Sequence, residues 1–154
     1  MTLDPNKPTD QALNSEWPSW IRAIHVAINA IVAGGSQIAT RVLSILAGDT
    51  SLTVGTDLSA LALEVIFVSG TGPSTLETIY GGSQGQIKIF IFSDGNVSVL
   101  DGDKIGGQFY LNQLPVYTTF HAQDGDVLAL VNVGGNGSTN HGYWKELYRQ
   151  IAVK

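Results

Sequence analysis

The distribution of glycine divides this sequence into two regions. All 18 glycines of the 154 residues lie at or after Gly34. Because glycine weakens helices and supplies the positive φ angles of tight turns, the first region suits a helix and the second needs many turns. We therefore expect three segments: an extended arm over 1–14, a helical stem and linker over 15–47, and a β-domain over 48–154.

The segment over 1–14 is polar, is interrupted by prolines and has no apolar period, as is typical of an extended arm. A helix start follows it, because Asn14 or Ser15 can cap the first turn and Pro18 is tolerated there. The apolar positions beyond this start are spaced 4, 3, 4 and 3 residues apart. They are Trp17, Ile21, Ile24, Ile28 and Ile31.

This spacing is a seven-residue repeat, and isoleucine at both seam positions favours coiled coils of three or more chains. The repeat therefore predicts a trimerisation helix with those five side chains at its seam. The phase continues beyond Gly34-Gly35 through Ile38, Val42 and Ile45. A single amphipathic helix packed on its own β-domain fits equally well, because periods of 3.5 and 3.6 residues differ little over about 17 residues.

After Gly48 the apolar pattern changes to a period of two. Residues 61–68 and 86–92 read as strands that are nearly apolar on both faces around one charge each. Such strands need cover on both faces, so we expect one face to form the core and the other to contact another subunit. Further strands are expected at 96–100, 108–111, 126–133 and 143–153.

Asp-Gly pairs at 94–95, 101–102 and 124–125 separate these strands and suit tight turns. Many short strands without intervening helices indicate an antiparallel sandwich or barrel. The predicted fold class is therefore mainly β: an N-terminal arm and a short trimerisation helix, followed by an antiparallel sandwich-like or barrel-like head.

Composition excludes several functions. The net charge is −5 without a Lys/Arg cluster, which argues against nucleic-acid binding. The chain has no run of 18 apolar residues, no secretory signal and no cysteine, so we expect no membrane span and no thiolate chemistry. Only 14% of the residues are charged, against about 25% in typical soluble proteins. A surface short of charge is often covered by copies of the same chain.

No motif indicates catalysis, a metal site or a cofactor. The glycine-rich loops at 81–86 and 134–139 precede strands rather than the helix that a phosphate site needs. The aspartate pairs at 101–103 and 124–126 do not continue into a calcium loop. The three histidines are scattered, and there is no Gly-x-Ser-x-Gly. We expect no enzyme activity.

One aromatic cluster near the C-terminus has two interpretations. Tyr143, Trp144 and Tyr148 alternate with cationic side chains and could line a glycan-binding face. The same residues could form a closing strand of the β-domain, which we favour.

Taken together, these parts resemble the small fibre and decoration proteins of tailed-bacteriophage virions. The residues that carry the resemblance are the Trp-anchored stretch 17–29 and the later segments 85–90, 109–115, 126–132 and 142–147. The resemblance implies a parallel homotrimer without enzyme activity that assembles onto the capsid or tail.

A repetitive fibre shaft is absent, so a capsid decoration or cement protein (a head fibre) fits better than a long tail fibre. We expect a protein made in the host cytoplasm and located in the virion, with a capsid or other virion protein as its partner. The expected docking residues are Leu3, Pro5, Pro8 and Trp20. The alternative is a short tail fibre or receptor-binding module that recognises host glycans.

Overall fold

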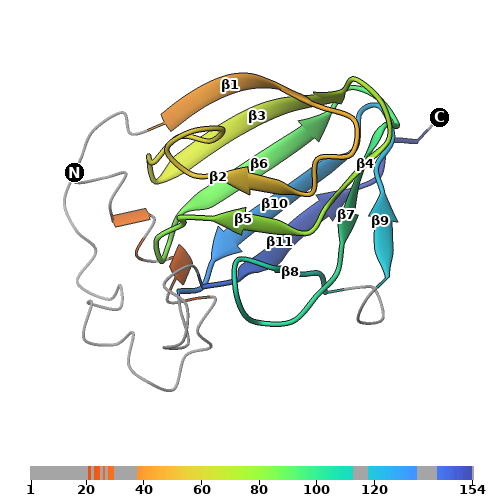
Figure 1. Cartoon of the computed structure of the whole chain (residues 1–154). Coiled ribbons are helices and arrows are strands. Elements are labelled where there is room, and N and C mark those ends of the chain that lie inside the picture. The colour runs from red at the N-terminus through yellow and green to blue at the C-terminus, as the bar shows by residue number, and fades with distance from the viewer. Residues whose placement is uncertain are drawn as a thin grey trace.

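The structure is a computed structural model that describes residues 38–112, 118–134 and 142–153, together with six residues between 21 and 29. The described part is mainly β, as predicted, and holds three sheets (Figure 1). Its strands are β1 (Ile38–Ile45), β2 (Ser51–Thr53), β3 (Leu63–Gly70), β4 (Ser74–Leu76), β5 (Thr78–Tyr80), β6 (Ile87–Phe92), β7 (Val97–Leu100), β8 (Phe109–Tyr110), β9 (Thr119–His121), β10 (Val127–Asn132) and β11 (Trp144–Gln150).

The first seven strands form a parallel coil. The chain passes from the main sheet to the other sheets and then returns to lie parallel to the strand it left. Ile38 pairs with Leu63, and Leu63 pairs with Ile87, so β1, β3 and β6 stack at intervals of 25 and 24 residues. In the same way β5 stacks on β2, and β7 stacks on β4. The turn formed by β3, β4 and β5 thus has one strand in each of the three sheets.

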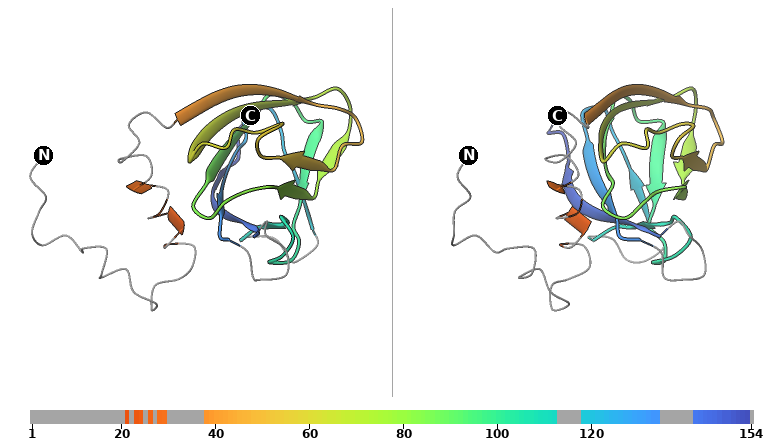
Figure 2. Two further views of the ribbon diagram at one scale, coloured as in Figure 1. Left: turned by 60° about the vertical axis from the view of Figure 1, so that its left-hand side comes forward. Right: turned by 90° about the vertical axis from the view of Figure 1, so that its left-hand side faces the viewer.

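The remaining strands complete the sheets. The main sheet has the order β1-β3-β6-β10-β11-β8, in which β10 is antiparallel to both β6 and β11. The third sheet has the order β4-β7-β9, with β9 antiparallel to β7. The views in Figure 2 show these sheets wrapped around a common interior.

The expectation of an antiparallel head is wrong for five of the eight strand pairs described, which are parallel. Among all eight described pairs, the antiparallel pair β10–β11 is the only one that joins strands consecutive in the chain. The physical reason lies in the Asp-Gly segments at 94–95 and 124–125. Each of them connects strands of different sheets rather than the two arms of a hairpin.

The β-domain begins earlier than the predicted boundary at residue 48. β1 occupies Ile38–Ile45, inside the segment expected to be a linker, and is an edge strand of the main sheet. The seven-residue repeat continues through Val42, but this segment is a strand and not a helix. Its side chains point alternately to the two faces of the sheet. Val42 is exposed and Ile45 is buried. The predicted arm over 1–14 lies outside the described residues.

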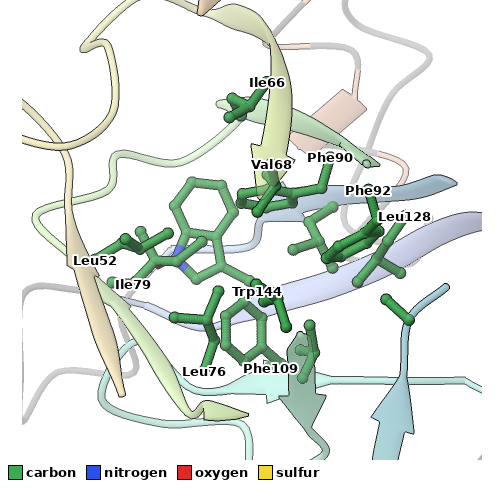
Figure 3. Close-up of a cluster of buried hydrophobic side chains, with 14 of the residues drawn as sticks. Leu52, Ile66, Val68, Leu76, Ile79, Phe90, Phe92, Phe109, Leu128 and Trp144 are labelled. Carbon is green, nitrogen blue, oxygen red and sulfur yellow. Dashed lines mark hydrogen bonds between the residues drawn. The ribbon is translucent and has the colours of Figure 1, made fainter. Parts of the chain in front are cut away.

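One hydrophobic core lies between the sheets, with Trp144 at its centre (Figure 3). The indole is fully buried, and its Nε1 donates a hydrogen bond of 3.0 Å to the carbonyl oxygen of Ile79. The other aromatic members are Phe90, Phe92, Phe109 and Phe120. This core is formed by the inward side of the main sheet only. The apolar side chains on the outward side are therefore not part of it.

A buried ion pair fastens the loop between β2 and β3 to the coil. The Nζ of Lys88 lies 2.8 Å from Oε2 of Glu64, and both side chains are fully buried. Lys88 also donates to the carbonyl oxygen of Ser59, whose own N–H donates to Glu64. Arg41 bonds the other carboxylate oxygen of Glu64 and the carbonyl oxygen of Asp57. The loop is thereby held where Leu58 fills the core.

Candidate assembly surface

The outward side of the main sheet is an apolar surface, which we call the outer face. The strand register aligns its side chains in three rows that run from β1 to β11. The rows are Ile38, Leu63, Ile87, Val131 and Lys145; Thr40, Val65, Ile89, Ala129 and Tyr148; and Val42, Phe67, Ile91, Val127 and Gln150. Lys145, at one corner, is the only charged residue among these positions.

Several of these apolar side chains are exposed. Val42 is 80% exposed, Tyr148 55%, Ile38 52% and Phe67 39%. The exposure is greatest on β1 and β3, while Val131 at the other end is fully buried. A contiguous apolar surface of this kind commonly marks a contact with another protein.

The buried end of the outer face is covered by a helical part of the N-terminal region. Ala23 is fully buried against Val131 and Val133, and half-buried side chains of β6 and β11 pack around them. Val26 lies over Gly85, where a Cβ atom would come within 2.8 Å of the valine Cγ1. Figure 2 shows these helical residues outside the sheets. Glycine at position 85 therefore permits this close approach.

The predicted seam lies partly within the described residues. Ile21, Ile24 and Ile28 are helical; the first two are half-buried and Ile28 is 50% exposed. An α-helix turns by about 100° per residue, which puts Ile21 and Ile28 on the side opposite Ala23 and Ile24 on the flank between the two sides. Trp17 and Ile31 lie outside the described residues. The β-domain thus contacts the Ala23 side, as the alternative of packing within one chain requires. Ile21 and Ile28 lie on the side turned away from it, and Ile24 lies at the flank.

The expected docking residues Leu3, Pro5, Pro8 and Trp20 also lie outside the described residues. The surface identified here therefore comprises the outer face and the isoleucine side of the helical residues. The sequence predicts strands that are apolar on both faces, with one face in the core and the other in contact with another subunit. That prediction missed β1, which carries the most exposed member, Val42.

Two members of the aromatic cluster, Trp144 and Tyr148, lie on opposite sides of β11. Trp144 is buried in the core, whereas Tyr148 points outward on the outer face. A β-bulge separates them, because Leu130 pairs with Glu146 while Ala129 pairs with Tyr148. Because β11 has one extra residue at the bulge, the side chains beyond it point to the opposite faces from those that simple alternation would give. Including Trp144 in a glycan site is therefore wrong.

A second group of polar side chains lies at the edge of the core, on β11 and the segments beside it. Asp101 is buried, and its Oδ1 accepts a 2.6 Å hydrogen bond from the N–H of Leu111 while Oδ2 has no partner. Glu146 accepts a 2.7 Å bond from Arg149. Burial raises the pKa of Asp101, and the negative charge of Glu146 raises it further.

No group of three His, Asp or Glu side chains in the described part of the chain could hold a metal ion. Among the same residues, no helix is long and apolar enough to cross a membrane. No protein-family model, curated protein or solved structure matches this chain. The outer face is therefore the feature from which we argue a function.

Proposed function

We propose that this chain is a non-enzymatic structural protein of a tailed-phage virion, a homotrimer that decorates the capsid and docks on it through its N-terminal region. The observation that carries the assembly part of the proposal is the outer face. It is apolar, nearly free of charge and exposed in the single chain. The virion location rests on the resemblance of the sequence to phage fibre and decoration proteins.

The isoleucine side of the helical residues supports the same proposal. Ile24 and Ile28 belong to the seven-residue repeat, and neither is fully buried by the chain's own β-domain. Burying each such side chain between subunits would contribute about 1.5–3 kcal/mol. Three copies of the seam, with the outer faces beside them, would make the trimer hard to separate.

The proposed trimer is tested by placing charges at the seam. Ile24→Asp combined with Ile28→Asp should give a monomer, because three copies of each carboxylate would lie together in an apolar seam. Light scattering of the purified protein measures the mass in solution. Val153→Asp is the matched control, since Val153 is 99% exposed and lies outside the outer face. A double variant that is still trimeric would contradict the role of the seam.

The proposed location is tested by cryo-electron microscopy of particles that carry the protein. Density for trimers on the head would support a decoration protein. Density on the tail would contradict that role and would identify the short tail fibre instead.

A further inference from the structure

A recess on the third sheet, away from the outer face, is built by three successive turns of the coil. Gly48 and Thr50 follow β1, Pro73 to Thr75 follow β3, and Gly95, Asn96 and Ser98 follow β6. Backbone hydrogen bonds join the turns: Gly48 donates to Pro73, and Ser74 donates to Asn96, at 3.1 and 3.0 Å. The wall of the recess is therefore a fixed framework.

The strand register places three polar side chains in a row across the recess. Thr75 of β4 pairs with Ser98 of β7, which pairs with His121 of β9. The hydroxyl of Ser98 and Nδ1 of His121 are 3.0 Å apart and hydrogen-bonded, so each fixes the orientation of the other. Asn96 donates through Nδ2 to the carbonyl oxygen of Gly70, at 2.8 Å, which leaves its Oδ1 as an acceptor.

The lining chemistry selects the kind of molecule. The recess has a volume of about 510 Å³, within the range of ligand sites in general. Its lining residues offer hydroxyl, amide and imidazole groups, and none of them is an acid, a lysine or an arginine. An anion would find no fixed positive charge there, and a cation no carboxylate. Pro73 is the one apolar ring among them, so an apolar peptide side chain has little to contact.

We propose that this recess binds a neutral saccharide through Thr75, Asn96, Ser98 and His121. The residues differ from the aromatic cluster considered from the sequence, and they lie on a different sheet from the outer face. The site does not depend on the assembly role proposed above. Saccharide binding and oligomeric state can therefore be measured separately on the same protein.

The test uses the full-length protein on an array of maltotriose, chitotriose, lactose and sialyllactose, followed by calorimetric titration with the neutral sugars that bind. Binding of at least one neutral sugar is expected. Ser98→Ala should weaken that binding by about tenfold, as the loss of a paired hydrogen-bonding group would. Thr75→Val, which removes a hydroxyl at nearly constant volume, is the second variant. Thr40→Ala, a hydroxyl on the outer face, is the matched control.

Light scattering and circular dichroism of each variant establish that it is folded and assembled as the parent protein is. The proposal is overturned if no neutral sugar binds, or if binding requires the sialic acid. It is also overturned if Ser98→Ala and Thr75→Val, both folded, bind as tightly as Thr40→Ala. None of these results would affect the proposed trimer, which the Asp variants test independently.

Discussion

At the scale of single residues, the lone charges of the two most apolar strands explain each other. Glu64 is the only charged residue of β3 and Lys88 the only one of β6, and the parallel register makes them direct partners. Their contact is buried, and Ser59 and Arg41 complete the hydrogen bonding of the carboxylate. One charge in each strand is a sequence signal that aligns the two strands correctly.

Lys88→Met should lower the free energy of unfolding by about 3–5 kcal/mol, because it leaves the Glu64 carboxylate buried without its closest cation. Urea denaturation at neutral pH measures the loss. Adding Glu64→Leu to this variant should restore part of the stability, since the buried charge is then removed as well. A single variant as stable as the parent would mean that the ion pair does not fasten the coil.

The raised pKa of Asp101 predicts how its contribution to the free energy of unfolding changes with pH. Burial raises its pKa above the ordinary value of 3.8, so the folded state binds the proton more tightly than the unfolded state does. The contribution of Asp101 to stability is therefore greatest at low pH and falls as pH rises through the raised pKa.

Asp101→Asn keeps an oxygen for the N–H of Leu111 and removes this dependence. The variant should be more stable than the parent at pH 7. The two should be equally stable well below pH 3.8, where Asp101 is protonated in both the folded and the unfolded parent. Thermal unfolding followed across this range gives the comparison. A parent that is more stable than the variant at pH 7 would show that the ionised carboxylate is favoured.

At the scale of elements, the sequence predicts where most long strands lie but not how they pair. The apolar runs at 61–68 and 86–92 contain most of β3 and all of β6. Parallel pairing was missed because it depends on residues about 24 positions apart, whereas Asp-Gly turns suggest neighbouring hairpins. β1 was missed because two isoleucines and a valine at helical spacing continue the earlier repeat. Strand alternation then divides them between the two faces of the sheet.

The outer face is tested with charges on two neighbouring strands. Val42→Asp combined with Phe67→Asp should lower the mass in solution without unfolding the chain, because both side chains are exposed in the single chain. Each Asp would have to lose its water in a contact between subunits, which is strongly unfavourable. Analytical ultracentrifugation measures the mass, with Val153→Asp as the control. Unchanged association would place the contact between subunits elsewhere.

At the scale of the whole molecule, the structure shows where the uncharged surface lies. The three rows of the outer face hold one charged residue, and the recess on the third sheet is lined by uncharged ones. Composition alone predicts a surface for partners. The position of that surface could not be predicted, because it requires the register of five strands and the bulge that turns Tyr148 outward.

In the proposed function the arm docks on the capsid and the helix forms the trimer, and this predicts the behaviour of a truncated chain. The β-domain from Ile38 onward builds its own core, and the seam positions begin beyond the arm. Deleting residues 2–14 should therefore leave a folded trimer. It should also abolish the coating of particles, since the expected docking residues Leu3, Pro5 and Pro8 are lost. Light scattering measures the first result, and cosedimentation with undecorated particles measures the second. Normal coating by the truncated trimer would assign docking to the β-domain or the helix, and the arm would then have no role in attachment.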